Sequence, residues 1–229
     1  MENILGHLSK DRSMLEAYIT HEQAVLESLY RKVQEQMTNQ GIHPRIANKD
    51  APLTVGEREK ICGQLDDLCI EVSSIEFYPA TAFSHKLGLF LLKSAVALQD
   101  DHRDEAAQHF MRAYVISKLA RFWDFLERMY EDFSVRDRAG MGADIDGWKE
   151  QLDEESKLLM KRDVAGKTYT PEYNELWQQL RLTIEHLKGI FKDYAGETDR
   201  GARREAVKDL KEYISSFDLP GKVADIVKE

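Results

Sequence analysis

The stretch AFSHKLGLFLLKSAVAL, residues 82–98, decides the fold class, because one histidine and two lysines are its only ionisable residues. Wound as an α-helix, it is apolar on nearly every side, which is typical of a helix in the centre of a core. Lys86 and Lys93 share a narrow stripe through which their ammonium groups can reach water while their stems are buried. We therefore predict a central apolar helix over residues 80–99.

The same stretch does not fit a membrane span. It is shorter than the about 20 residues that cross a bilayer, and each lysine would cost about 2.5–3.5 kcal/mol near the bilayer centre. The first residues, MENILGHLSKDRSMLEAY, contain neither the basic nor the apolar region of a signal peptide. The expectation is a cytoplasmic protein without membrane contact.

Composition favours helices and one large domain or two small ones. Of the 229 residues, 42% are hydrophobic and only 5 are proline and 13 glycine, so long uninterrupted helices with a packed core are feasible. The 41 acidic and 32 basic residues give a net charge of −9, which repels nucleic acid on average. Cys62 and Cys69 are seven residues apart on a predicted helix, too far for a disulfide, which fits a reducing compartment.

Apolar residues at spacings of three and four predict helices on both sides of the central stretch. We expect one long helix over residues 2–38, a loop over 39–53, and a second helix that begins with a capping box at Thr54 and Glu57 and ends before Pro79. The acidic stretch DDHRDE, residues 100–105, caps a further helix that runs to about Phe133. No run alternates as a strand would, so the predicted fold is an all-α bundle of about six to eight long antiparallel helices.

Residues 135–147 are the clearest predicted linker, because they hold three glycines and no apolar periodicity. They separate a helical bundle over residues 1–134 from a C-terminal helical part over 148–229. That second part is either separate or packed on the first as one domain.

Residues 95–114, AVALQDDHRDEAAQHFMRAY, resemble one tetratricopeptide unit. Ala106, Phe110 and Ala113 match the A-x-x-x-F-x-x-A spacing of the second helix of that repeat. The pattern does not recur at a period of 34 residues. The resemblance implies a tight helical hairpin at this place in the chain.

Several short strings look like catalytic or metal motifs but lack their partners. HRDE at 102–105 has neither the asparagine nor the glycine-rich loop of a kinase, and GADIDG at 142–147 lacks the first carboxylate of a calcium loop. Glu105 and His109, one helical turn apart, form only half a metal site, and a solvated pair is the better interpretation. We therefore predict no catalytic residue, cofactor or metal, and these observations favour a non-enzymatic protein over an enzyme.

His85, Lys86 and Lys93 form the first candidate site, either a buried polar cluster or a pocket for a small anionic ligand. We expect His85 to be partly buried, on the side of the helix that it shares with Leu89, Leu92 and Val96. On this alternative the protein is an enzyme or a sensor.

A second alternative is an accessory subunit of a nucleic-acid-processing complex. Its candidate contacts are basic residues of the linker and of the last long helix: Arg136, Arg138, Arg200, Arg203 and Arg204. Acidic residues alternate with the second group, which is typical of a solvated, salt-bridged helix.

The leading hypothesis is a non-enzymatic adaptor, scaffold or complex subunit that binds another protein or itself. The apolar stripe of the helix over 2–38 is longer than a compact neighbour usually covers, which favours a homodimer or a partner helix there. A second predicted docking element is the amphipathic tail, with Leu219, Val223, Ile226 and Val227.

Overall fold

The structure, a computed structural model, describes residues 24–38, 40–75 and 80–132, residues 178–186, and short stretches and single residues between 147 and 222. These residues form helices and turns, and no strand occurs among them, so the predicted all-α class is confirmed. The chain divides into two compact units, Met1–Arg121 and Phe122–Glu229. Apart from Gly147, the predicted linker over 135–147 lies outside the described residues.

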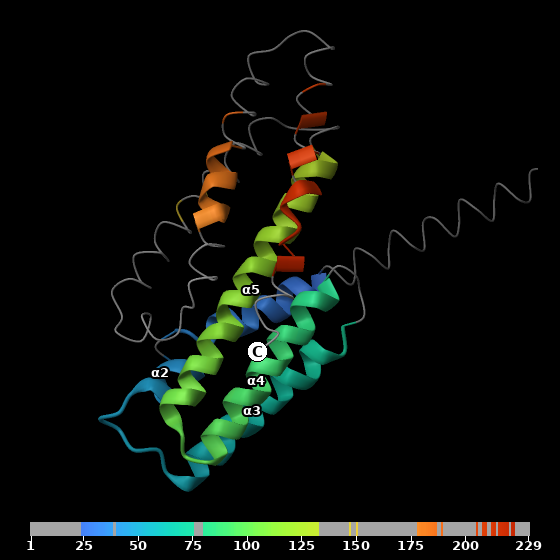
Figure 1. Cartoon of the computed structure of the whole chain (residues 1–229). Helices are drawn as coiled ribbons and strands as arrows, with labels where there is room; N and C mark the ends of the chain where they lie inside the picture. The colour runs from blue at the N-terminus through green and yellow to red at the C-terminus, as the bar shows by residue number, and fades with distance from the viewer. Residues whose placement is uncertain are drawn as a thin grey trace, which may run out of the picture. The chain divides into compact units, whose positions relative to one another are not determined.

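The first unit contains helical residues 24–35 and the helices α2 (Ile42–Ala47), α3 (Val55–Ser73) and α4 (Ala80–Gln99), followed by the start of α5 (Arg103–Asp132) (Figure 1). The bounds of α4 and α5 agree with the predicted helices, whereas α3 ends at Ser73, ahead of Pro79. None of the helices among the described residues combines the length and apolar character that a bilayer crossing requires.

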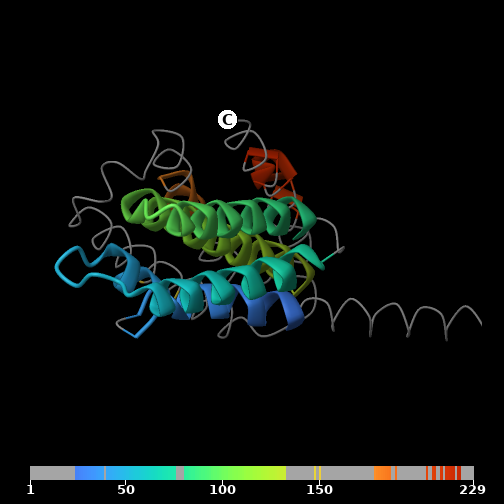
Figure 2. The ribbon, with the colours of Figure 1, turned by 90° about the horizontal axis from the view of Figure 1, so that it is seen from below.

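Helical residues 24–35, α3, α4 and α5 form a closed ring of neighbours. Lys32 of the first helix pairs with Glu71 of α3 at 2.6 Å, and Arg121 of α5 donates to Gln34 of the first helix at 2.8 Å. The Sγ of Cys69 on α3 donates to the carbonyl oxygen of Gly88 on α4 at 3.3 Å. Figure 2 shows α3 beside the first helix, and α4 beside α5. The first unit is therefore a four-helix bundle with the short α2 added.

The bundle core is made of apolar side chains that face inward from all of these helices. Those that are at most 1% exposed include Val33, Ile46, Ile61, Leu65, Val72, Phe83, Leu87, Leu91, Leu98, Phe110, Ile116 and Leu119. On α3 the apolar residues that recur at spacings of three and four, from Ile61 to Ile75, are buried. Its predicted capping box is also present, because Thr54 Oγ1 accepts from Glu57 N–H at 3.3 Å and Glu57 accepts from Thr54 N–H at 3.0 Å.

The helix α2 lies in the stretch that the sequence predicts as a loop, so this part of the prediction is wrong. Pro44 is its third residue, where a missing N–H costs no hydrogen bond because the first turn of any helix has none to make. The guanidinium of Arg103, at the start of α5, holds the other end of α2. It donates at 2.6–3.1 Å to four backbone carbonyl oxygens, those of Arg45, Ile46, Asn48 and Ala51.

The chain enters α2 through a tight turn at Gly41. The N–H of Gly41 donates to Thr38 at 2.9 Å, and the N–H of His43 donates back to the carbonyl oxygen of Gln36 at 3.0 Å. This fold of the backbone brings Gly41 directly against Gln36. An added Cβ at Gly41 would overlap with the backbone of Gln36, so only glycine fits this turn.

The hairpin between α4 and α5 is tight, as the resemblance to a tetratricopeptide unit implies. Asp101 adopts φ 64°, the left-handed conformation that follows a helix in a Schellman motif. The two hydrogen bonds of the motif run from His102 N–H to the carbonyl oxygen of Ala97 at 2.8 Å and from Asp101 N–H to that of Leu98 at 3.2 Å. The hydroxyl of Ser94, fully buried between the helices, donates to the carbonyl oxygen of Ala106 at 2.8 Å.

We expect Asp101→Ala to be less stable than Asp101→Asn by about 0.5–1 kcal/mol, because asparagine tolerates the left-handed conformation better than alanine does. Both substitutions remove the ion pair between Asp101 and Arg58 at 3.0 Å, so their difference isolates the backbone term. Urea denaturation of the two variants measures it. Equal midpoints would show that the conformation of residue 101 does not limit the hairpin.

The second unit is described mainly by residues 178–186, 212–213, 215–219 and 221–222. Its buried side chains among the described residues include Leu180, Thr183, Ile184, Phe217 and Leu219. The hydroxyls of Thr183 and Tyr213 lie 3.0 Å apart, and Lys222 donates to Gln179 at 3.0 Å. These contacts join the two described segments within the unit, and Leu180 and Ile184, one helical turn apart, are both buried.

Candidate functional site

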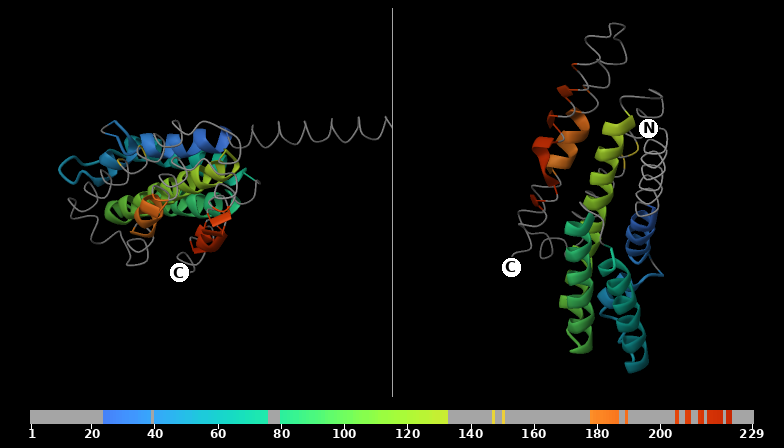
Figure 3. Two further views of the ribbon diagram at one scale, coloured as in Figure 1. Left: turned by 90° about the horizontal axis from the view of Figure 1, so that it is seen from above. Right: turned by 90° about the vertical axis from the view of Figure 1, so that its right-hand side faces the viewer.

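One face of α4 is exposed, so the prediction that this helix is buried on nearly every side is wrong. Leu92 and Val96, one turn apart, are 46% and 48% exposed. His85 is also exposed rather than partly buried, and Gln99 continues the same side of the helix. His85 and Gln99, the polar residues at the two ends of this side of the helix, indicate in the sequence that the side is exposed to solvent. Figure 3 shows α4 next to α5 in the left view, and in the right view α4 covers the lower part of α5.

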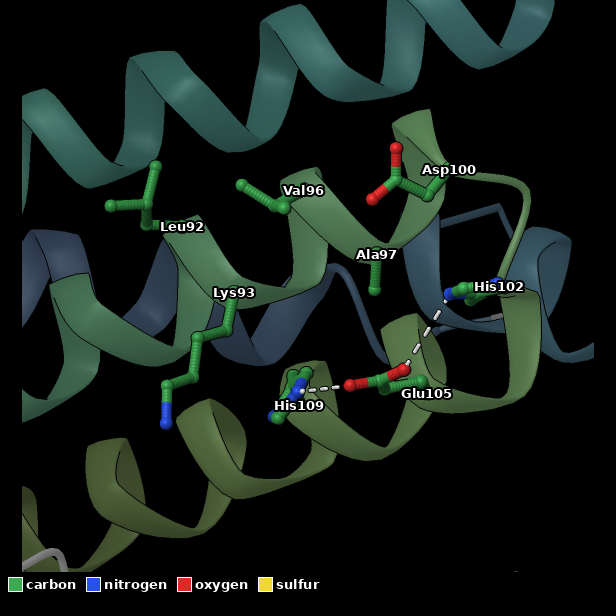
Figure 4. A pocket seen from close by; sticks show the side chains of 8 residues that line it. All are labelled: Leu92, Lys93, Val96, Ala97, Asp100, His102, Glu105 and His109. Carbon is green, nitrogen blue, oxygen red and sulfur yellow. Dashed lines mark ion pairs between the residues drawn. The ribbon is translucent and has the colours of Figure 1, made fainter. Parts of the chain in front are cut away.

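A groove of about 410 Å³ lies where the second half of α4 meets the first half of α5. We call it the α4–α5 groove (Figure 4). Its α4 side is formed by Leu92, Lys93, Val96, Ala97 and Asp100, and its α5 side by His102, Glu105 and His109. Leu92 and Val96 lie on one stripe of α4, and Asp100, four residues further on, continues this stripe in the turn directly after the helix, where its N–H still donates to the carbonyl oxygen of Val96 at 3.1 Å.

The α5 side of the groove is organised around the carboxylate of Glu105. One oxygen lies 3.8 Å from Nδ1 of His102 and the other 3.5 Å from Nε2 of His109, as the dashed lines in Figure 4 show. The predicted pair of Glu105 and His109 is thus present, one helical turn apart. Among the residues that the structure describes, no group of three or more His, Cys, Asp or Glu side chains has a metal-binding arrangement.

His109 lies at the inner side of the groove against Phe90. The two rings stack with their centroids 6.0 Å apart, and Lys93 Nζ and the Arg112 guanidinium each lie 5.6 Å from the Phe90 centroid. Burial lowers the pKa of His109, and the positive charges of Arg112 and Lys93 lower it further, although Glu105 acts in the opposite direction. The imidazole is therefore held in its neutral form at neutral pH.

Because the pKa of His109 is lower in the folded than in the unfolded chain, the unfolded chain binds the proton more tightly. The contribution of neutral, buried His109 to the free energy of unfolding is therefore complete above the ordinary imidazole pKa of 6.5. It falls as the pH drops from 6.5 toward the lowered pKa of the folded chain. We expect His109→Gln to lose less stability than the wild type between about pH 8 and about pH 5. Urea denaturation at both values measures this, with His102→Gln, an exposed histidine beside the same carboxylate, as control. Equal losses in wild type and His109→Gln would contradict the assignment.

The acidic residues around the hairpin differ in their partners. Asp101 pairs with Arg58 at 3.0 Å, and Asp104 pairs with Lys49 at 2.8 Å. Asp100 and Glu105, which line the groove, have no lysine or arginine at ion-pair distance among the described residues. The groove therefore has a negatively charged end where, within the described residues, neither carboxylate forms an ion pair with lysine or arginine.

The first candidate site predicted from the sequence is only partly brought together. Lys93 lines the groove, whereas His85 and Lys86 do not. Lys86 is half-buried and has interactions of its own. Asp100 and Glu105 share the groove with Lys93, and two carboxylates disfavour an anion there. The small anionic ligand stays a prediction.

The other predicted contact residues lie mostly outside the described part of the chain. This holds for Arg136, Arg138, Arg200, Arg203 and Arg204, and for Val223, Ile226 and Val227. Leu219 is described and fully buried, so its side chain is part of an interior and is not available for docking. Within the predicted helix over 2–38, the described residues Leu26, Leu29, Tyr30 and Val33 are buried in this chain, and the homodimer stays a prediction.

No protein-family model, curated protein or solved structure matches this chain.

Proposed function

We propose that this protein is an adaptor or complex subunit that docks another protein in the α4–α5 groove. The observation that carries the proposal is the pair Leu92 and Val96, two large apolar side chains about half exposed, one turn apart, beside a hollow. A continuous apolar surface rimmed by polar side chains is typical of a protein-binding site.

The other exposed apolar residues of the described part do not form such a pair. They are Val25, Val55, Ile70 and Leu182, and no two of them lie within one helical turn. Isolated exposed apolar residues are common on protein surfaces. Leu92 and Val96 differ because a partner could cover both at once and gain about 25 cal/mol for each Å² of apolar surface removed from water.

The test compares complex formation by the wild type and by the double variant Leu92→Ser/Val96→Ser. A partner isolated with the tagged full chain from its native source is purified, and its dissociation constant is measured by calorimetry. We expect the double variant to weaken binding by at least about tenfold, because both apolar contacts are lost. Because both positions are about half exposed, serine there should leave the core intact, and circular dichroism checks that the variant keeps its helix content.

Ile70→Ser is the matched control. Ile70 is 68% exposed on α3, outside the groove, so its substitution removes a similar exposed apolar side chain without touching the proposed site. Binding should be unchanged in this variant. A partner that binds the Leu92→Ser/Val96→Ser variant as tightly as the wild type would show that docking does not use the groove.

A further inference from the structure

We infer that the α4–α5 groove accepts an amphipathic helix of a partner protein that carries a lysine or arginine one turn beyond two apolar residues. The inference rests on the docking function proposed above and names the chemistry of its partner. It follows from two features of the groove, the spacing of its apolar residues and the position of two carboxylates that have no lysine or arginine partner among the described residues.

The spacing of the apolar residues favours a helix as the occupant. Leu92 and Val96 are separated by one turn, about 6 Å along α4, and Asp100 follows after the same interval at the end of the helix. Residues four apart on a partner helix repeat at the same interval, so two of them can contact Leu92 and Val96 together. A groove between two packed helices is also the shape that the ridge of a third helix fills.

The charges place the basic residue of the partner. Beyond Val96 the groove ends at Asp100 and Glu105. In the described part of the chain, the ion-pair neighbours of Glu105 are His102 and His109 rather than a lysine or arginine. Figure 4 shows Lys93 toward the opposite end of the groove from Asp100 and His102. A cation one turn beyond the apolar pair would meet Asp100 and Glu105, while the net charge of −9 favours basic partners over acidic ones.

The experiment uses helix-forming alanine- and glutamine-rich peptides, capped at both ends and labelled for fluorescence anisotropy. Each carries leucine at positions i and i+4, and lysine, serine or glutamate at i+8. A fourth peptide keeps the lysine but has serine in place of both leucines. Dissociation constants are measured with the full chain, with Leu92→Ser/Val96→Ser, and with Asp100→Asn/Glu105→Gln.

We expect the lysine peptide to bind the full chain about threefold to tenfold more tightly than the glutamate peptide. This ratio should approach one in Asp100→Asn/Glu105→Gln, and binding of all peptides should be lost in Leu92→Ser/Val96→Ser. The peptide without leucines should not bind.

Two results would overturn the inference in different ways. Leucine peptides that bind through Leu92 and Val96 with no preference for lysine, or with a preference for glutamate, would refute the basic partner and leave the docking function in place. No binding of any leucine peptide up to about 1 mM would refute a helix-accepting groove. In that case the calorimetric comparison with the native partner decides the docking function separately.

Discussion

Gly41→Ala is expected to lower the free energy of unfolding by about 2–4 kcal/mol. The new Cβ would overlap with the backbone of Gln36, which cannot rotate away as a flexible side chain could. Relief requires that the turn between the first helix and α2 opens. Opening it breaks the hydrogen bonds that join Gly41 to Thr38 and His43 to Gln36. Urea denaturation of the full chain, followed by circular dichroism, measures the loss.

Gly63→Ala is the matched control, because the same substitution is expected to have the opposite sign there. Gly63 is an exposed residue in the interior of α3, and no atom lies within 4 Å of the position of an added Cβ. Alanine should therefore raise the free energy of unfolding by about 0.5–1 kcal/mol through its higher helix propensity. If both variants were destabilised equally, the overlap at Gln36 would not be the cause.

Arg103→Ala should lower the free energy of unfolding by about 2–3 kcal/mol. The guanidinium donates to four backbone carbonyl oxygens around the end of α2, and the bonds to Arg45 and Ile46 are partly buried. A helix leaves its last carbonyl groups without intrahelical partners, and here one side chain satisfies several of them. With alanine at position 103 these carbonyl oxygens would lose their donors, and those that are partly buried would not be fully hydrated instead. Chemical denaturation again provides the measurement.

Two further variants separate geometry from charge. Arg103→Lys keeps the positive charge but replaces the planar fork of donors, so it should recover only part of the loss. Arg31→Ala removes an exposed guanidinium that pairs with Glu27 at 3.4 Å, and it should change stability by less than about 0.5 kcal/mol. A loss in Arg103→Ala no larger than in Arg31→Ala would mean that the carbonyl contacts contribute little.

The sequence predicts the long helices well, because their signals are local and repeated. The apolar stripe from Ile61 to Ile75 and the capping box at Thr54 state where α3 begins and which side it buries. The bounds of α4 are equally evident, because they coincide closely with the apolar run over residues 82–98. In the first helix the apolar spacing is less informative: Val25 and Leu29 are four residues apart, yet Val25 is 36% exposed and Leu29 is buried.

The short helix α2 could not be predicted because the contacts that stabilise it come from far along the chain. Its six residues are too few to form a helix by themselves, and Gly41 and Pro44 favour a loop. Arg103, more than fifty residues later, supplies the donors for its end. No local pattern contains that information.

The candidate site was predicted only in fragments for a similar reason. Glu105 and His109 were recognised as a pair from their spacing, and Lys93 from its place in the apolar stretch. Their meeting with Asp100 and His102 depends on the hairpin at Asp101, a turn that is set by one left-handed residue without a glycine to mark it. The exposure of Leu92 and Val96 depends on which helices pack around α4, and periodicity alone does not fix that.

The attachment of α2 to Arg103 has a consequence for amide hydrogen exchange. A segment of six residues normally opens by itself, and its amides exchange at low free energy. Here the end of α2 can open only if the hydrogen bonds from the Arg103 guanidinium, at the first turn of α5, to the carbonyl oxygens of Arg45 and Ile46 break. The amides of α2 should therefore exchange together with those of that turn, as one cooperative unit built from two distant parts of the sequence.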